Sequence, residues 1–271
     1  MTERVTVYAV LGWPVAHSRS PQMLDAAFGA MGMSAIALPI AVPPEKLAAA
    51  VAGLFGMGMI GASVTLPHKI AVKAVCDELS PAAREISAVN CLHRDGARLI
   101  GHNTDCDGFV DALDAAGIDL RTQRIVLLGA GGAARGIAYG VRDAPALDVI
   151  ARRPDEVTWA RAWPWTSDKL RECFARADLV VDCTPTGLDP AADAALADSL
   201  PLDALPTAAR VVTLVYHRRT NLLERASARG HATLDGRAML VHQGARAFTI
   251  WTGRPAPIDV MTRALDDAMK I

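Results

Sequence analysis

The sequence predicts an α/β protein of two lobes, and three observations support this fold class. Over the N-terminal third, strand-like runs alternate with helical patterns, which is typical of α/β units. The alternation restarts near Arg124, where an apolar strand runs directly into a glycine-rich turn and a helix. With 271 residues, 51% of them hydrophobic and 21% charged, the chain can bury the cores of one or two domains. The second lobe is expected to begin near Thr104.

The elements of the first lobe follow from local signals. Short apolar, β-branched runs predict strands, and apolar residues at three- and four-residue spacing predict helices, two of which begin at a proline. The pair Asp95-Gly96 predicts a hairpin turn. The expected elements are, in order, the strand Val5 to Leu11, the helix Pro21 to Met31, the strand Ser34 to Ile40, the helix Pro44 to Phe55, the strand Ile60 to Thr65, the helix Ile70 to Leu79, the hairpin strands Cys91 to Arg94 and Arg98 to His102, and the helix Asp107 to Ala116.

The second lobe is expected to contain further strand and helix units, followed by two closing helices. The Ala- and Asp-rich stretch from Asp189 to Asp203 is expected to be a surface loop. The expected elements are the strand Arg124 to Leu128, a helix that ends near Gly140, the strands Asp148 to Ala151, Leu179 to Asp182 and Arg210 to Val215, and the helices Arg237 to Trp251 and Ile258 to Met269.

Composition narrows the classes of partner. A formal net charge of -1 and a pI near 6.6 do not indicate a nucleic acid or an anionic membrane as partner. Five scattered cysteines without metal-ligand spacing suggest a reducing compartment, no disulfide framework and no metal site. No apolar run has the length of a membrane span, and the first residues lack a signal-peptide core. A cytoplasmic location is therefore expected.

The turn GAGGAA at residues 129–134 opens a helix directly after a strand. Gly129 permits a tight turn, Gly131 lets the backbone approach a ligand, and Ala134 takes the third position of the dinucleotide fingerprint, which tolerates alanine. The N–H groups at the start of such a helix can hold a pyrophosphate. Dinucleotide binding is predicted; the alternative is a turn rich in small residues for packing alone.

The next strand indicates which nucleotide binds. NAD enzymes place an acidic residue about 20 positions past the fingerprint to bond the ribose 2′-OH. Here the strand ends in Arg152 and Arg153, and Asp148 lies at its other end. Two guanidinium groups can bind a 2′-phosphate through charge-assisted hydrogen bonds. NADP is therefore expected, and two solvated surface arginines are the alternative.

Polar residues collect in the loops that follow strands of the first lobe. Lys69 ends the segment GASVTLPHK at a strand-to-helix corner, where Pro67 is expected to open the helix. Ser18 and Ser20 precede one helix and Asp105 precedes another, so that Ser20 and Asp105 could instead be N-caps. This supply of hydroxyl and amide groups around one Lys/Asp pair suits a polyhydroxylated small-molecule substrate. The further polar residues of these loops are Asn90, Asn103 and Thr104.

Seven short motifs stand along the chain in a fixed order. They are the SxS of Ser18 and Ser20, the VTxPHK ending in Lys69, the AVN of Asn90, the NTD of Asp105, the GAGG of residues 129–132, the CTPTGL of residues 183–188 and the GRAMLVHQGA that contains Gln243. In this order and at these separations they resemble the shikimate dehydrogenase family over nearly the whole chain. Several ordered motifs are stronger evidence than any one of them.

The resemblance implies the reversible NADPH-dependent reduction of 3-dehydroshikimate to shikimate, a step toward chorismate and the aromatic amino acids. It implies that Lys69 and Asp105 are the catalytic pair. Hydride delivery to a carbonyl leaves an alkoxide, which a lysine ammonium can stabilise and protonate; a merely solvated lysine is the alternative. Expected substrate contacts are Ser18, Ser20, Thr65, Asn90, Tyr216 and Gln243. Expected cofactor contacts are Gly129, Ala130, Gly131, Gly132, Ala133, Ala151, Arg152, Arg153, Thr184, Leu214 and Gly236.

The resemblance also implies a domain plan. A substrate domain would comprise residues 1–103 plus 238–271, and an inserted Rossmann-type, doubly wound NADP domain would comprise residues 104–237. The expected oligomeric state is a monomer or a homodimer.

Some positions depart from the family pattern. Ser63 stands in place of Asn, Cys106 in place of Gly, Ala151 and Arg153 in place of the Asn and Thr around Arg152, Thr213 in place of Asp, and Arg218 in place of Pro. The alternatives are a paralogue that prefers quinate or an amino analogue, and a non-catalytic NADP-binding regulator. The intact SxS favours shikimate over quinate, and retention of both Lys69 and Asp105 argues against the regulator.

Overall fold

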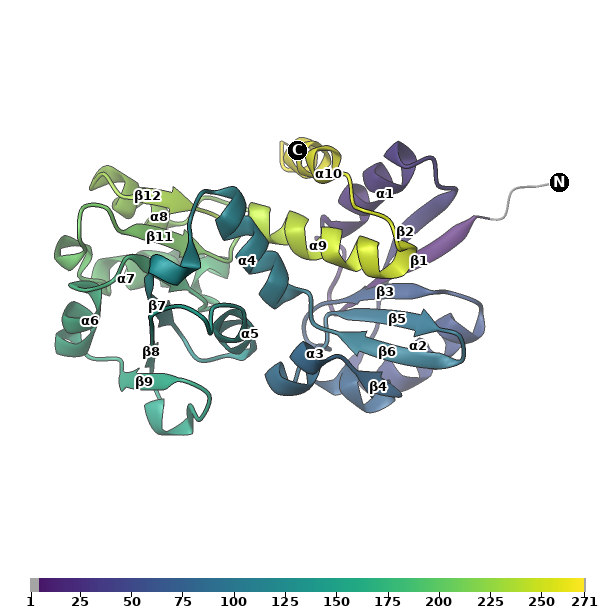
Figure 1. Cartoon of the computed structure of the whole chain (residues 1–271), viewed down its shortest axis with the longest axis horizontal. Helices are drawn as coiled ribbons and strands as arrows, with labels where there is room; N and C mark the ends of the chain where they lie inside the picture. The colour runs from purple at the N-terminus through teal and green to yellow at the C-terminus, as the bar shows by residue number, and fades with distance from the viewer. Residues whose placement is uncertain (1–4, 271) are drawn as a thin grey trace. The chain divides into compact units, whose positions relative to one another are not determined.

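The computed structural model describes residues 5–270, which form two compact units. Unit 1 extends to Gly108 and resumes at Leu240, and unit 2 comprises Phe109–Met239. Each unit is a β-sheet with helices packed on it (Figure 1). Two helices contain the points where the chain passes from one unit to the other, α4 (Asp105–Ala115) and α9 (Arg237–Thr252).

Unit 1 is built on a six-stranded mixed sheet with the order β2-β1-β3-β5-β6-β4. β1 runs parallel to β2 and β3, whereas β5 is antiparallel to β3 and forms the predicted hairpin with β6. The carboxyl ends of β1 and β3 therefore meet at one edge of the sheet. The strands are β1 (Thr6–Gly12), β2 (Ala35–Ala41), β3 (Gly61–Val64), β4 (Glu78–Leu79), β5 (Cys91–Asp95) and β6 (Arg98–His102).

The central strand β1 is buried on both of its faces, because successive side chains of a strand point to opposite sides. Tyr8 and Val10 of β1 pack in a cluster with α1, α9 and α10, and Ala9 and Leu11 pack in a second cluster with α2. The Tyr8 ring stacks on Phe28 and Trp251 at centroid distances of 4.8 and 5.0 Å. The other helices of unit 1 are α1 (Ser20–Ala30), α2 (Leu47–Gly56), α3 (Pro81–Ile86) and α10 (Ile258–Ala268).

Unit 2 is a parallel sheet of six strands in the order β12-β11-β10-β7-β8-β9. The order reverses between β7 and β10, as in a doubly wound dinucleotide-binding fold, whose ligands bind beyond the carboxyl ends of the strands at that point. The α/β prediction with a Rossmann-type lobe is thus confirmed. The strands are β7 (Arg124–Leu128), β8 (Ala146–Ala151), β9 (Arg161–Pro164), β10 (Leu179–Asp182), β11 (Arg210–Thr213) and β12 (Ala232–Leu234).

Helices also bury both faces of the second sheet. Ile125 and Leu127 of β7 lie in one core cluster, and Val126 and Leu128 lie in another. Such a nearly continuous apolar run is what a parallel strand buried on both faces requires. The helices within unit 2 are α5 (Gly132–Gly140), α6 (Ser167–Phe174), α7 (Pro190–Ser199) and α8 (Asn221–Ala228).

The helix expected from Ile70 to Leu79 is wrong. A short 3₁₀ turn, Ala71–Val75, is followed by the strand β4. The Asp77 N–H donates to the Leu99 carbonyl (2.8 Å), and the Asp77 carboxylate accepts from the Leu99 N–H (2.7 Å). These hydrogen bonds hold the chain extended beside β6, so that tertiary pairing prevails over local helix propensity.

The loop expected from Asp189 to Asp203 is also wrong, because it contains α7. Asp189 caps this helix by accepting hydrogen bonds from the N–H groups of Ala191 and Ala192, and Pro190 stands in the first turn. These are N-terminal signals, and alanine has the highest helix propensity. The structure also contains elements that were not predicted, namely β4, β9, β12, α3, α6 and α8.

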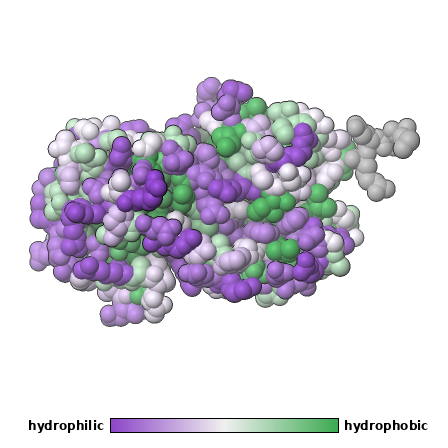
Figure 2. Space-filling view, in the orientation of Figure 1, coloured by the Kyte–Doolittle hydropathy of each residue, from purple (hydrophilic) through white to green (hydrophobic). Residues whose placement is uncertain are grey.

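The surface of both units mixes residue types. Figure 2 shows hydrophilic residues over much of the visible face of each unit, with separate hydrophobic residues among them. Within residues 5–270, no helix is long and apolar enough to cross a membrane.

Candidate active site

Lys69 and Asp105 form an ion pair in unit 1. Lys69 lies in the turns that follow β3, and Asp105 is the first residue of α4. The Lys69 Nζ lies 2.8 Å from Asp105 Oδ2, with 30% and 19% of the two side chains exposed. This partial exposure leaves the ammonium able to reach a ligand, while the carboxylate fixes its position.

Asn90 joins this pair to two further residues. Its Nδ2 group donates to Asp105 Oδ1 and to Thr104 Oγ1, both at 2.9 Å, and lies 3.3 Å from Gln243 Oε1. Its Oδ1 accepts from the Thr104 N–H at 2.7 Å. Lys69, Asn90, Asp105 and Gln243, which we call the unit 1 cluster, are therefore one hydrogen-bonded group, although 153 residues separate Asn90 from Gln243.

A glycine allows Gln243 to reach this group. A Cβ atom at Gly108 would lie 2.5 Å from the Gln243 backbone nitrogen and 2.6 Å from its Cα. Only a residue without a side chain permits α4 to approach this part of α9 so closely. The Gln243 Nε2 group also donates to the Leu240 carbonyl at 2.8 Å, which orients the amide oxygen toward Asn90.

The remaining expected substrate residues of unit 1 lie beyond the ends of β1 and β3. Thr65 follows β3, and its backbone N–H donates to the Leu11 carbonyl of β1 at 2.8 Å. A Cβ at Gly12 would lie 2.6 Å from the Thr65 methyl group, so the two strand ends are in close contact. Ser18 and Ser20 end the loop that leaves β1, and α1 begins at Ser20.

Neither Ser20 nor Asp105 caps the helix that it was expected to precede. Ser18, not Ser20, accepts from a backbone N–H at the start of α1, that of Ser20 at 3.3 Å. Asn103 accepts from the Asp105 N–H (3.1 Å), so Asp105 is not the N-cap of α4. Pro67 does not open a helix, because a series of turns follows it.

Three polar residues support the site, although they were not among the expected contacts. Thr104 holds both ends of the Asn90 amide, and Asn103 also donates to the Ala88 carbonyl at 3.0 Å. His68, 1% exposed, lies with its ring Nε2 2.7 Å from the Val42 carbonyl oxygen, which anchors the turn before Lys69. Their place in the NTD and PHK motifs was the available sequence signal.

In unit 2, the glycine-rich turn joins β7 to α5. Gly129 has a φ of +96°, a conformation that favours glycine. Cβ atoms at Gly131 and Gly132 would meet nothing within 4 Å, so space remains beside the backbone at the start of α5. Gly131 is the N-cap of α5 and has no side chain to satisfy the first N–H groups. This turn, with the exposed Ala133 and the half-buried Ala130, fits a pyrophosphate.

The two arginines after β8 differ in their partners. Arg153 binds Glu156 at 2.8 Å, whereas Arg152 has no ion-pair or hydrogen-bond partner within residues 5–270. Asp148 is 6% exposed and accepts from Trp163 Nε1 (2.8 Å) and Arg176 Nη2 (3.1 Å). The acidic residue of this strand is thus already bonded within the fold, and after Ala151 stands an exposed guanidinium that is unpaired among the residues the structure describes. This donor set fits a 2′-phosphate better than a 2′-hydroxyl.

Thr184, Leu214 and Gly236 lie near the carboxyl ends of β10, β11 and β12. The Thr184 methyl would be 3.2 Å from a Cβ at Gly129, which places Thr184 beside the glycine-rich turn. A Cβ at Gly236 would lie 2.1 Å from the Leu214 carbonyl oxygen, so that glycine is required there. Tyr216 follows β11 and meets His217 edge-to-face, with ring centroids 6.0 Å apart.

Asp182, at the end of β10, orients Thr184. Its Oδ1 accepts from the Thr184 N–H (2.9 Å) and hydroxyl (2.6 Å). Burial raises the pKa of Asp182 to about 6, although the hydrogen bonds from Thr184 oppose this shift. Its buried Oδ2 has no partner within the described part of the chain.

The departures from the family pattern are accommodated in different ways. Ser63 is half-buried in β3 opposite Cys91. Cys106 is fully buried, and burial raises the pKa of its thiol to about 12. The Thr213 hydroxyl accepts from the Val215 N–H at 3.4 Å, and Arg218 forms an ion pair with Asp193.

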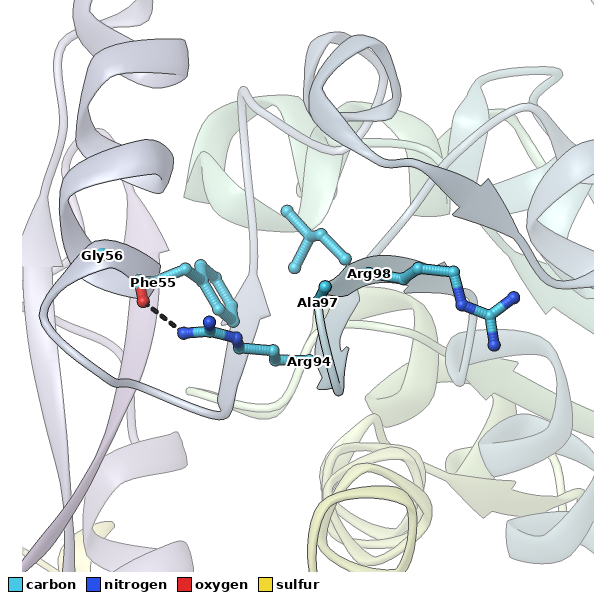
Figure 3. Close-up of a pocket in the computed structure, with 6 residues that line it drawn as sticks. Phe55, Gly56, Arg94, Ala97 and Arg98 are labelled. Atoms are coloured by element: carbon cyan, nitrogen blue, oxygen red, sulfur yellow. Dashed lines mark hydrogen bonds between the residues drawn. The ribbon is translucent and has the colours of Figure 1, made fainter.

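A separate small pocket lies between the end of α2 and the β5–β6 hairpin (Figure 3). Arg94 points across it to the Phe55 carbonyl oxygen at 2.7 Å. None of the residues that line this pocket belongs to the sites above. Among residues 5–270, no group of three or more His, Cys, Asp or Glu side chains could hold a metal ion.

Comparison with known proteins gives consistent results. The family model of the shikimate dehydrogenase substrate binding domain matches residues 10–92, and that of the shikimate 5′-dehydrogenase C-terminal domain matches residues 236–265. The NADP(+)-dependent shikimate dehydrogenase of Symbiobacterium thermophilum is 41% identical over 274 residues, which cover 95% of this chain and 92% of that protein.

Solved structures agree with the sequence matches. Shikimate 5-dehydrogenase from Thermus thermophilus, in complex with NADP(H) and shikimate, is 36% identical with a TM-score of 0.86, covering 97% of this chain and 99% of that one. The ligand-free 5-ketofructose reductase of a Gluconobacter species is 29% identical with a TM-score of 0.83, covering 98% and 99%.

Proposed function

The chain belongs to the shikimate dehydrogenase family, and from this premise we propose that it catalyses the reversible NADPH-dependent reduction of 3-dehydroshikimate to shikimate. The reaction is an oxidation or reduction at a CH–OH group, in the biosynthesis of aromatic amino acids. The observation that carries the proposal is the unit 1 cluster, in which Lys69 is ion-paired to Asp105 and Asp105 is held by Asn90.

Lys69 is the proposed proton donor. When bound, the nicotinamide supplies the hydride. The Lys69 ammonium uses one N–H on Asp105 and can donate another to the substrate oxygen that gains negative charge. Transfer of that proton gives the hydroxyl in the reduction, and the neutral amine accepts it in the oxidation. Asp105 holds Nζ in place, so that the side-chain entropy of a long lysine is not lost at the moment of reaction.

The neighbouring polar groups bind the substrate in this proposal. Asn90 and Gln243 carry amides in the unit 1 cluster, and Thr65 lies on the chain segment that leads to Lys69. Hydroxyl and amide side chains discriminate well between polyols, because an unmatched hydroxyl leaves a buried polar group unpaired. The full proposed set is Ser18, Ser20, Thr65, Asn90, Gln243 and, from unit 2, Tyr216.

The proposed cofactor site uses mostly backbone. Gly129, Ala130, Gly131, Gly132 and Ala133 would hold the pyrophosphate through N–H groups. Arg152 would bind the 2′-phosphate, with Arg153 and Ala151 beside it. The open space at the turn and the unpaired state of Arg152 among the described residues support this assignment. Thr184, Leu214 and Gly236 complete the proposed contacts.

Steady-state kinetics test the proposal. NADP+-dependent oxidation is measured with shikimate, quinate and an amino analogue, and NADPH oxidation with 3-dehydroshikimate and 5-ketofructose, in each case against NAD(H). The expected result is the highest kcat/KM for the shikimate pair with NADP(H). A preference for quinate would instead identify the protein as a paralogue with a different substrate. Saturable NADP+ binding without turnover of any substrate would identify it as a non-catalytic NADP-binding regulator.

We also expect residues 104–237 to act as the NADP domain, residues 1–103 plus 238–271 to bind the substrate, and the enzyme to work in the cytoplasm. Light scattering on the purified protein distinguishes the two expected states, monomer and homodimer.

A further inference from the structure

The segment Leu214–Thr220 joins β11 to α8 and carries two proposed contacts, Leu214 and Tyr216. It contains neither helix nor strand. Its first part is held by close packing against two glycines. Gly236 allows the Leu214 carbonyl to approach, and a Cβ at Gly187 would lie 2.5 Å from the Val215 side chain. Further along the segment, two residues after Tyr216, stands Arg218.

Arg218 is paired with a buried carboxylate. Its Nη1 lies 3.0 Å from Oδ2 of Asp193, which stands in the first turn of α7. The Asp193 side chain is 0% exposed and that of Arg218 is 25% exposed. Breaking this ion pair would leave the fully buried Asp193 carboxylate without its cation, which is strongly unfavourable.

Asp193 also holds the end of the same segment. Its Oδ2 accepts from the Asn221 N–H at 2.6 Å and from the Asn221 amide at 2.9 Å. Asn221 is the first residue of α8, and Thr220 caps this helix by accepting from the Leu223 N–H at 3.3 Å. One carboxylate therefore connects α7, the start of α8 and the middle of the segment between β11 and α8.

Arg218 also stands at a position where a different residue would restrain the backbone. Arg218 stands where the family resemblance predicts proline, a residue that restricts the backbone by fixing φ. A chain without that proline has one less restraint on the segment that carries Tyr216. The ion pair from Arg218 to Asp193 restrains the same segment by a different physical means.

We propose that Arg218 is a positioning residue, which acts through its ion pair with Asp193 to hold Tyr216 in the conformation that binds the substrate. The proposal rests on the proposed function for its kinetic consequence. Its structural consequence, the ordering of Leu214–Thr220, does not depend on that function. If the segment were free to move, only part of the population would be competent to bind, and the apparent affinity would fall by that fraction.

The test compares substitutions of this pair with those of a matched pair. Arg218→Met removes the charge and keeps the length of the side chain, and Arg218→Lys retains the charge. Lysine also lacks the Nε and Nη2 donors, which in Arg218 are buried without a partner among the described residues. The control is Arg225→Met, which breaks the exposed ion pair between Arg225 of α8 and Asp198 of α7.

Three quantities are measured on each full-length variant. They are kcat and KM for shikimate with NADP+, the Kd of 2′,5′-ADP by calorimetry, and the hydrogen exchange of the 214–220 amides relative to β11. For Arg218→Met we expect KM to rise about tenfold, kcat to change less, 2′,5′-ADP binding to stay within about twofold, and exchange in 214–220 alone to accelerate. Arg218→Lys should recover most of the KM, and Arg225→Met should resemble the wild type.

Unchanged exchange in 214–220 for Arg218→Met overturns the proposal, and so does an unchanged KM in an active enzyme. A loss of 2′,5′-ADP binding in parallel with activity also overturns it, because it indicates general unfolding of unit 2. If Arg218→Met does not fold, Arg218→Gln is measured with the same criteria and a smaller expected change. An inactive wild type contradicts the proposed function, while the exchange data still decide whether Arg218 orders the segment.

Discussion

The two candidate sites are built in different ways. In unit 1, side chains bind one another: Lys69, Asp105, Asn90 and Gln243 are connected by hydrogen bonds before any ligand binds. In unit 2, the site consists of backbone groups, open space at Gly131 and an arginine with no partner within residues 5–270. The first arrangement fixes reacting groups, and the second leaves donors available for a ligand. Substitutions in unit 1 should therefore change the chemical step, and those in unit 2 should change binding.

The largest expected effect is that of Lys69→Ala. Removing the ammonium should lower kcat by about 10²–10⁴-fold and change KM much less, because the lost interaction stabilises the transition state. Steady-state kinetics with shikimate and NADP+ measure it. Lys46→Ala, at an exposed lysine of unit 1, is the control. If Lys69→Ala turned over substrate as fast as the wild type, Lys69 would not act in the chemical step. The difference in role between the two sites would then be contradicted.

A carboxylate of each unit can also be compared. Asp105 is paired with Lys69, whereas Asp182 has no cation partner among the described residues. The raised pKa of Asp182 means that its contribution to the free energy of unfolding is fully present below pH 3.8 and is lost as pH rises through about 6. In Asp182→Asn this loss is absent. The variant should gain about 2 kcal/mol relative to the wild type between pH 4 and pH 7.

Urea unfolding across this pH range measures the difference. Asp203→Asn is the control, because the hydrogen bond from Arg171 lowers the pKa of this exposed carboxyl, which gives a small dependence of the opposite sign. A difference between Asp182→Asn and the wild type that does not vary with pH would show that Asp182 titrates like an exposed carboxyl.

Arg152→Ala tests the binding site of unit 2. Loss of a charge-assisted contact to the 2′-phosphate should weaken NADP+ by about 1.5–3 kcal/mol and leave NAD+ unchanged. Arg153→Ala should have a smaller effect, because Arg153 is engaged by Glu156. Calorimetric titration with both nucleotides separates the two residues. Equal losses for NADP+ and NAD+ in Arg152→Ala would exclude recognition of the 2′-phosphate by this side chain.

A pair of glycine substitutions gives the smallest expected effect. In Gly108→Ala the methyl group meets the Gln243 backbone, and the overpacking cost of about 1–3 kcal/mol exceeds the gain in helix propensity of about 1 kcal/mol. In Gly131→Ala the methyl group enters open space. Thermal unfolding should therefore show a loss for Gly108→Ala alone, whereas NADP+ titration should show weaker binding for Gly131→Ala alone. The reverse pattern would contradict both assignments.

Local sequence signals were sufficient for much of the fold. The alternation of strands and helices, the hairpin at Asp95-Gly96 and the strand-turn-helix at Gly129 all depend on neighbouring residues, and the structure confirms them. One error arose where a distant partner acts, and another where a local signal was overlooked. The segment after Ile70 is extended because Asp77 bonds to Leu99 of β6. The N-cap at Asp189 is a local signal for α7. It was overlooked because the segment from Asp189 to Asp203 is rich in Ala and Asp and was expected to be a loop.

The sequence by itself determined the residue types of both sites and placed many of them in loops that follow strands, since parallel strands bring their carboxyl ends to one edge of a sheet. Only the tertiary structure decided which side chains meet. Asn90 contacts Gln243 across 153 residues because Gly108 lets two helices approach, and Arg218 finds Asp193 on a helix that was expected to be a loop. Such contacts depend on the packing of whole elements, which no local pattern of residues contains.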